Sequence, residues 1–215
     1  MAYVELLGCT NFSFLTGVSH PDDLITRAAA VGVSHIGIVD RDGVQGVVRA
    51  HVAAKRAGMR ILCGATLSVE GAPSLALIAQ DMRGWANLCR LITRARGRAQ
   101  KGWASTTVEE VAQYAEGLTA IIRFGWEETP ARRLRDAFEG RICIAWSQNL
   151  TPRDRRRTAW AFSLSAVLDV PVVATNDPLC ATTEEQPLAD ILTAIRRSCT
   201  VADLGVHAQV NAEQY

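Results

Sequence analysis

Two aspartates stand where an α/β enzyme would place catalytic groups, each after an apolar run of strand length. Residues 35–39 run into Asp40, and residues 170–174 run toward Asp177. Cys9 ends a third run of this kind, residues 3–9. In a parallel α/β barrel, the residues that follow the strands meet at one face, and this face carries the active site. We therefore expect Asp40, Asp177 and Cys9 to converge at one end of a barrel.

The elements that must position these residues alternate between strand-like and helix-like patterns. Helices are predicted for residues 45–57, closed by Gly58, and from Trp85 onward, where apolar residues recur at spacings of three and four. Strands are predicted at 59–63, 118–124 and 141–146, with a hairpin through 71–73 to a strand at 75–79. This alternation favours a parallel α/β barrel. An open doubly wound sheet remains possible, although no Gly-x-Gly-x-x-Gly follows any strand.

Two helix starts carry capping-box patterns. Thr106 with Glu109 predicts one, and Thr151 with Asp154 predicts another that has Pro152 at its first helical position.

Length and composition describe a single ordinary globular domain. The chain has 215 residues, 48% of them hydrophobic and 21% charged, and a formal net charge of +1. Near-neutrality gives no reason to expect nucleic-acid binding by the chain as a whole, so a basic surface must be local. The six cysteines include no C-x-x-C pair and read as reduced thiols. No apolar run reaches membrane length and no signal peptide is visible. We expect a cytoplasmic protein with no membrane partner.

One stretch is locally basic. Residues 83–101 contain no acid, and Trp103 follows nearby. The predicted contact residues are Arg90, Arg94, Arg96, Arg98 and Lys101. Such a run could track a phosphate backbone or meet an acidic neighbouring domain, and a solvated helix face is an equally good interpretation.

Four short motifs are specific. Asn11-Phe12-Ser13-Phe14-Leu15-x-Gly17, Asp40 with Gly46, Gly64-Ala65-Thr66 and Ala174-Thr175-Asn176-Asp177 follow one another in this order. In this order they resemble the PHP (polymerase and histidinol phosphatase) domain at the N-terminus of bacterial DnaE-type, C-family DNA polymerases. Ser19-His20-Pro21 and the segments 49–55 and 87–92 resemble its error-prone, translesion branch.

The resemblance covers nearly the whole chain and implies a fold. It implies an α/β, distorted TIM-like (β/α)7 barrel over residues 1–200. Residues 201–215 would then begin a linker toward a polymerase core, since similar residues precede the core in the polymerases that the chain resembles.

The resemblance also implies a two- or three-metal centre for phosphoester hydrolysis, but most of its ligand positions are changed here. The expected ligands fall on Leu7, Cys9, Arg41, Thr66, a position near Asn149, and Leu179, whereas Asp40 and Asp177 are kept. Leucine offers no lone pair, and Arg41 brings a fixed positive charge. Two unit positive charges about 4 Å apart repel by about 4 kcal/mol at an effective dielectric near 20. We therefore expect no catalytic residue and no cofactor in this domain, with Zn and Mn both absent.

In this interpretation Cys9, Asp40 and Asp177 are vestigial positions, and Arg41 pairs with Asp40 or Asp177 in the former metal pocket. An alternative is an active metal-dependent PHP phosphoesterase or 3′–5′ exonuclease with altered ligands: Cys9, Asp40, Asp177 and Cys180. A second alternative is a separate nucleic-acid-binding module that works through residues 83–101.

The function implied is that of a hydrolytically inactive PHP domain in an error-prone DNA polymerase, a structural and docking module for DNA synthesis past damage. The implied enzyme is the parent polypeptide, a DNA-directed DNA polymerase with Mg in its core. Expected partners are that core, DNA bound weakly, the sliding clamp and translesion accessory proteins.

Overall fold

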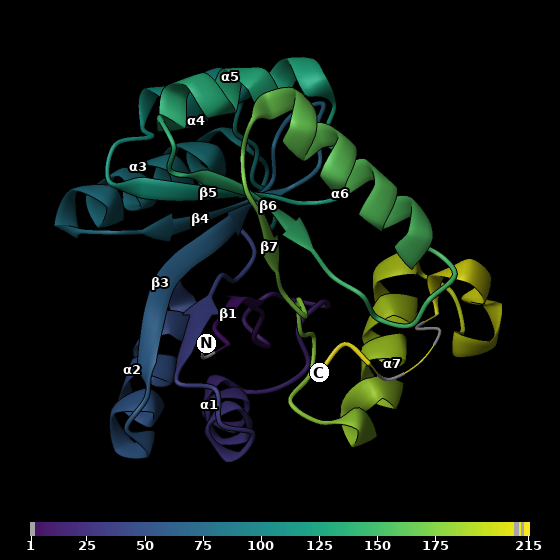
Figure 1. Ribbon diagram of the computed structural model, residues 1–215. Coiled ribbons are helices and arrows are strands. Elements are labelled where there is room, and N and C mark those ends of the chain that lie inside the picture. Colours follow the sequence, from purple (N-terminus) through teal and green to yellow (C-terminus); the bar gives the residue numbers. More distant parts are fainter. Residues whose placement is uncertain (1–2, 209–210, 212) are drawn as a thin grey trace.

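The computed structural model describes residues 3–208, 211 and 213–215 and shows a curled sheet of seven strands (Figure 1). The strands are β1 Glu5–Gly8, β2 His35–Ile38, β3 Arg60–Leu67, β4 Leu75–Ala79, β5 Leu118–Ile122, β6 Ile142–Trp146 and β7 Val172–Ala174. They lie in the sheet in chain order. Neighbours are parallel except β4, which is antiparallel to both β3 and β5. The predicted hairpin is therefore confirmed, and β4 is the one antiparallel strand of the described sheet, in an α/β fold of the predicted class.

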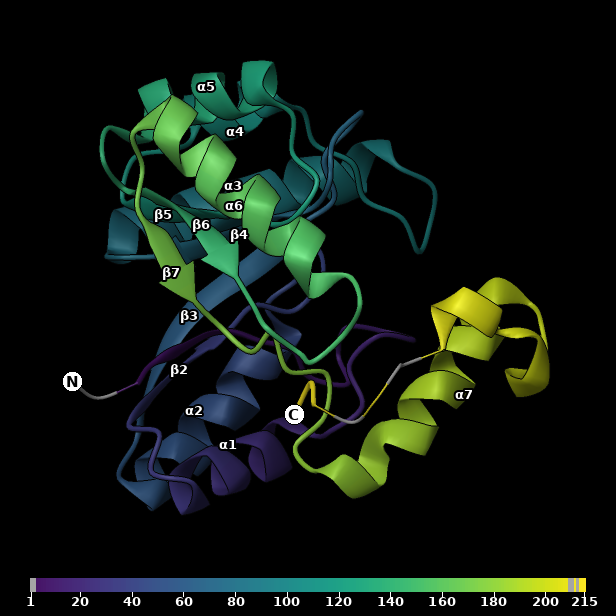
Figure 2. The ribbon, with the colours of Figure 1, turned by 45° about the vertical axis from the view of Figure 1, so that its right-hand side comes forward.

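Helices cover the outside of this sheet in two groups (Figures 1 and 2). The helices α1 Pro21–Ala30 and α2 Gln45–Ala57 lie beside the first strands. The second group, beside the later strands, is α3 Met82–Arg98, α4 Val108–Gln113, α5 Glu128–Phe138 and α6 Asp154–Leu168. The last helix, α7 Gln186–Arg197, stands apart from both groups in the two views. Within the described residues, no helix is long and apolar enough to cross a membrane.

Local sequence explains most helix ends. Gly58 closes α2 in the left-handed conformation (φ 68°), as the pattern predicts. The capping box of α4 uses Thr107 and Glu110 and not Thr106 and Glu109, so that prediction is wrong by one residue. Asp154 accepts hydrogen bonds from the backbone N–H of Thr151 (3.0 Å) and from its hydroxyl (2.7 Å), but α6 begins at Asp154, later than Pro152 predicts.

The apolar side chains form separate clusters on the two faces of the sheet. The larger outer cluster joins β4–β6 to α3–α6 around Leu77, Trp126 and Phe138. A second outer cluster joins β2 to α1 and α2. The inner cluster contains Leu7, Val39, Ala76, Ile78, Ile121 and Cys143, which come from or directly follow five of the strands. These inward side chains fill the curl of the sheet, as in a packed barrel.

A buried glutamate joins the two ends of the sheet. Glu5 on β1 accepts hydrogen bonds from the hydroxyl of Thr175 and from the backbone N–H of Asn176 (2.8 Å), both directly after β7. Its carboxylate also accepts from the Tyr3 hydroxyl (2.5 Å) and from the Leu7 N–H (2.7 Å). The carboxylate thus links strands that no ladder pairs in the described sheet.

The described residues near the C-terminus return to the barrel. The Asn176 side-chain amide donates to the Tyr215 carbonyl (2.6 Å), and the Leu179 N–H donates to the Gln214 carbonyl (3.0 Å). The predicted boundary at residue 200 remains a prediction, because these contacts do not separate a barrel from a linker.

Candidate functional site at the barrel mouth

A pocket of about 350 Å³ opens where the strands end. Residues that follow five different strands line it, among them Cys9 after β1, Arg41 after β2, Arg123 after β5, Ser147 after β6 and Asp177 after β7. The helices add Arg157 and Trp160 from α6 and Arg196 from α7. The predicted convergence of strand ends is therefore correct.

Asp40 is fully buried beside this pocket and holds the first loop in place. Its carboxylate accepts hydrogen bonds from the Thr10 N–H (2.8 Å), the Thr10 hydroxyl (2.8 Å to Oδ2) and the Ser13 hydroxyl (2.8 Å). Gly46 lies so close that a Cβ there would stand 2.3 Å from Asp40 Oδ2. The two carboxylate oxygens of Asp40 are therefore engaged by the protein itself.

Asp177 forms an ion pair with Arg123, which the sequence did not predict. The side chains are 18% and 28% exposed, respectively. Burial raises the pKa of the Asp177 carboxyl above its usual range, although the positive charge of Arg123 acts to lower it. Asp177 is thus a half-buried acid for which desolvation outweighs its counterion.

The predicted pairing of Arg41 is wrong. Its guanidinium donates to the Phe14 carbonyl (3.2 Å), and its backbone N–H donates to the Ser13 hydroxyl (2.9 Å). Asp40 already has hydroxyl and amide donors, and Arg123 already reaches Asp177. Arg41 lines the pocket but is exposed and holds the loop after β1.

The two cysteines considered as altered ligands are poor thiolates. Burial raises the pKa of the Cys9 thiol to about 12 and that of Cys180 to about 11. The Cys180 side chain packs with Val18 and Ala189 and lies 3.6 Å from the Gln214 carbonyl oxygen, outside the lining of the mouth pocket.

The residues at the mouth do not fit a catalytic metal centre. Among the described residues, no three His, Cys, Asp or Glu side chains are grouped so as to hold a metal ion. Leu7, Thr66 and Leu179 line the pocket at three of the positions where the resemblance implies ligands. A di- or trimetal site needs several imidazole and carboxylate donors, and here the remaining carboxylates have hydrogen bonds or an arginine instead. The expected absence of metal stays a prediction.

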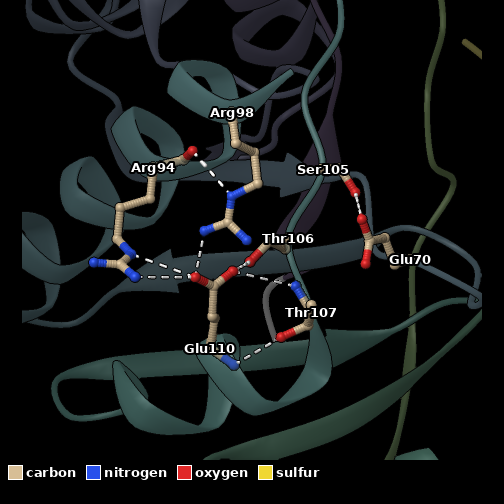
Figure 3. A network of polar contacts seen from close by, with 7 residues as sticks. All are labelled: Glu70, Arg94, Arg98, Ser105, Thr106, Thr107 and Glu110. Atoms are coloured by element: carbon tan, nitrogen blue, oxygen red, sulfur yellow. Dashed lines mark hydrogen bonds and ion pairs between the residues drawn. The ribbon is translucent and has the colours of Figure 1, made fainter.

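The basic stretch lies mainly on α3, where the tertiary structure supplies the acids that the stretch itself lacks (Figure 3). Glu110 of α4 accepts from both Arg94 and Arg98. Arg83 pairs with Glu116, and Arg96 donates to the Asp42 carbonyl (2.7 Å). Arg90 donates to the Asn87 side chain (3.1 Å), and Lys101 is exposed.

These arginines are therefore partly neutralised and partly structural, although no acid lies among them in the sequence. DNA or domain contact by this surface stays a prediction.

Sequence reasoning placed Arg41 in the pocket but missed Arg123, Arg157 and Arg196. Arg123 directly follows β5, which ends at Ile122, whereas the predicted strand ran to residue 124 and so hid Arg123 inside it. No local pattern marks Arg157 or Arg196, because they reach the mouth from helices.

This fold and the arrangement of strand ends are those of the PHP domain, whose family model matches residues 9–147. The chain belongs to this family. It is 38% identical over 225 residues to an error-prone DNA polymerase of Caulobacter vibrioides and 38% identical over 226 residues to one of Anaeromyxobacter dehalogenans. Each match covers 99% of this chain and 20% of the relative, so the chain spans about a fifth of the length of these polymerases.

Solved structures show the same fold at low identity. A Bifidobacterium adolescentis protein assigned as a metal-dependent phosphoesterase superposes with a TM-score of 0.59 at 14% identity, covering 81% of this chain and 86% of its own. An amidohydrolase from Chromobacterium violaceum has a TM-score of 0.55 at 17% identity and covers 83% and 88%.

Proposed function

We propose that this chain is the PHP domain of an error-prone DNA polymerase, and that it does not hydrolyse phosphoesters but supports the polymerase mechanically. The observation that carries the proposal is the chemistry of the mouth. Asp40 is held by Thr10 and Ser13, Asp177 is held by Arg123, and burial raises the pKa of the Cys9 thiol. A pocket without several imidazole or carboxylate groups free to bind a metal ion cannot activate a metal-bound water.

The matched relatives support the mechanical role through their length, since four-fifths of each lies outside the match. In this proposal the parent polypeptide is a DNA-directed DNA polymerase that acts in translesion synthesis and DNA repair in the cytoplasm. Its nucleotidyl transfer uses Mg held elsewhere in that polypeptide. Its partners are the polymerase core, DNA, the sliding clamp and translesion accessory proteins.

Helix α7 offers an apolar surface for docking on the polymerase core. Leu188, Ile191 and Ile195 lie at spacings of three and four, which places them on one face of the helix. Their side chains are 45%, 44% and 56% exposed. Three large apolar residues on one exposed helix face are typical of a surface that another part of a protein covers.

The first experiment measures metal and hydrolysis on the 215-residue chain. Elemental analysis after dialysis should find Zn, Mn and Fe well below one equivalent, and p-nitrophenyl phosphate and a DNA 3′ end should not be cleaved. Stoichiometric metal, with activity that is lost in Asp40→Asn, would establish the altered-ligand phosphoesterase and refute the proposal.

The second experiment tests docking in the full-length polymerase. The double variant Ile191→Glu with Ile195→Glu should lower primer extension while leaving the melting temperature of the 215-residue chain nearly unchanged. The control is Val48→Glu on α2, an exposed apolar residue on a different surface. Equal polymerase activity in the α7 variant and the control would remove α7 from the docking surface.

A further inference from the structure

The pocket at the barrel mouth is lined by four arginines and one carboxylate. Arg41, Arg123, Arg157 and Arg196 reach it from four separate segments, and the carboxylate is that of Asp177. Two further acids, Asp40 and Glu5, are not part of the lining but accept hydrogen bonds from the lining residues Ser13 and Thr175 and from backbone N–H groups. Positive charge therefore exceeds negative charge at the mouth even when these two acids are counted.

The donors of these arginines are only partly used. A guanidinium carries five N–H donors, and the hydrogen bonds of Arg41 and Arg196 to the protein use a minority of them. Arg41 donates one side-chain bond, to Phe14, and Arg196 bonds the Leu15 carbonyl (3.1 Å) and the Thr16 hydroxyl (3.0 Å). Both arginines are thereby fixed at the rim of the pocket with donors to spare.

Two buried polar atoms of the lining lack partners. The hydroxyl oxygen of Thr66, a residue that is 5% exposed, and Nε of Arg157 have no hydrogen-bond partner among the described residues. Buried polar groups are nearly always satisfied, by protein or by a bound molecule. Thr66 and Arg157 both line the pocket, Thr66 from β3 and Arg157 from α6, so two segments of the lining each contain an unsatisfied polar atom.

The cations also crowd one another. Burial, together with the charge of Arg41, lowers the pKa of Arg196. Like charges held close in a partly desolvated pocket are stabilised by an anion between them.

From this geometry we infer that the mouth of the barrel binds a phosphate group through Arg41, Arg123, Arg157 and Arg196. A phosphate oxyanion matches the forked donors of arginine. Trp146, Trp160 and Phe124 also line the pocket, and the Arg157 guanidinium lies 5.9 Å from the centre of the Phe124 ring. The site thus suits either free phosphate or the phosphate of a nucleotide or nucleic-acid end, with the rings beside the base. The inference deepens the proposed function, because it assigns an anion to the pocket proposed to hold no metal.

Asp177 is the internal competitor for this anion. Its carboxylate occupies Arg123, and its charge lies among the arginines of the pocket. Asp177→Asn removes that charge while keeping the size of the side chain, and asparagine tolerates the positive φ of 51° at this position. This substitution should therefore strengthen phosphate binding, the opposite of its effect on a metal site.

The test is isothermal titration of the 215-residue chain in EDTA with inorganic phosphate. Parallel titrations use a short single-stranded DNA with and without a 5′ phosphate. Arg157→Gln and Arg41→Gln should each weaken phosphate binding at least tenfold, and Asp177→Asn should tighten it severalfold. Arg49→Gln is the matched control, because Arg49 pairs with Asp22 away from the pocket and should leave binding unchanged. Thermal melting of each variant separates loss of binding from loss of folding, and the gain in Asp177→Asn does not depend on a destabilised variant.

Tighter binding of the phosphorylated DNA than of inorganic phosphate or of the hydroxyl-ended strand would identify a nucleic-acid end as the occupant. Equal affinity for inorganic phosphate and the phosphorylated strand would identify phosphate alone. Absence of binding by all three probes at millimolar concentration, or equal affinity in wild type, Arg157→Gln and Arg41→Gln, would overturn the inference. Binding that requires added Mn²⁺ would overturn both this inference and the proposed function. Binding in EDTA together with failure of the docking experiment would leave the phosphate site standing.

Discussion

Two carboxylates in this molecule each face arginine, and their environments move their pKa values in opposite directions. Asp177 at the barrel mouth pairs with Arg123, and burial raises its pKa. Glu110, between α3 and α4, pairs with Arg94 and Arg98, and the hydrogen bond from Arg98 is the main cause that lowers its pKa to about 2. The comparison shows that a counterion alone does not determine a pKa, because desolvation can outweigh it.

The same comparison separates the two candidate surfaces. At the mouth, arginines outnumber the acids, and two buried polar atoms of the lining residues have no hydrogen-bond partner in the described part of the chain. On α3, Glu110 and Glu116 neutralise arginines that look unopposed in the sequence. We therefore expect stronger anion binding at the mouth than on the run of basic residues.

The largest expected effect is that of Asp40→Ala. This change leaves the Thr10 N–H and the hydroxyls of Thr10 and Ser13 without their buried acceptor, and it should lower the free energy of unfolding by about 3 kcal/mol. Urea denaturation of the 215-residue chain measures it. Asp136→Ala is the control, because Asp136 pairs with Arg135 on the surface, and a similar loss in both variants would contradict the prediction.

Substitutions of Glu110 should lower the free energy of unfolding by a smaller amount, and two of them separate the capping box from the ion pairs. Glu110→Ala removes the capping box and both ion pairs and should cost about 2 kcal/mol, whereas Glu110→Gln keeps the capping hydrogen bond and should cost about 1 kcal/mol. Thermal or urea denaturation at pH 7 measures both. Glu109→Gln, which breaks an exposed pair with Arg133, is the control and should change stability less than Glu110→Gln.

The pH dependence of these two acids should have opposite signs. The folded-state pKa of Glu110 is depressed, so its stabilisation is present above the ordinary glutamate pKa of 4.5 and is lost as pH falls toward about 2. The folded-state pKa of Asp177 is raised, so its ionisation disfavours folding as pH rises above the ordinary aspartate pKa of 3.8. The stability of Asp177→Asn relative to wild type should therefore increase from acid to neutral pH. That of Glu110→Gln should decrease, and a series of unfolding curves from pH 3 to pH 7 would show whether the two slopes differ in sign.

The smallest expected effect is that of Arg94→Ala. Arg94 is 53% exposed and shares Glu110 with Arg98, so its loss should change the free energy of unfolding by less than about 0.5 kcal/mol. If Arg94 contacts DNA phosphate, the slope of log affinity against log salt should fall by about 1. An unchanged slope would leave α3 as a solvated surface.

Much of the fold could be predicted from local sequence. The periodicity of residues 45–57 and the glycine at 58 predicted the limits of α2 as the structure has them, because helix period and a left-handed end are local properties. The hairpin into β4 and the convergence of Asp40, Asp177 and Cys9 also followed from local patterns and the rule for strand ends. The antiparallel direction of β4 relative to β5 did not, because α3 and α4 lie between the two strands.

The partners of each charge were decided by the tertiary structure. The sequence shows that residues 83–101 lack an acid, but Glu110 and Glu116 come from the segments that follow. It shows that Arg41 adjoins Asp40, but in an extended chain neighbouring side chains point to opposite sides, and the Arg41 guanidinium bonds the Phe14 carbonyl instead. Asp177 pairs with Arg123, which is distant in the sequence. The residue types that follow each strand, such as Asp177 after β7, can be read from the sequence alone. The convergence of four arginines from separate segments on one pocket with Asp177 cannot, because two of the arginines come from helices whose positions depend on packing in the folded chain.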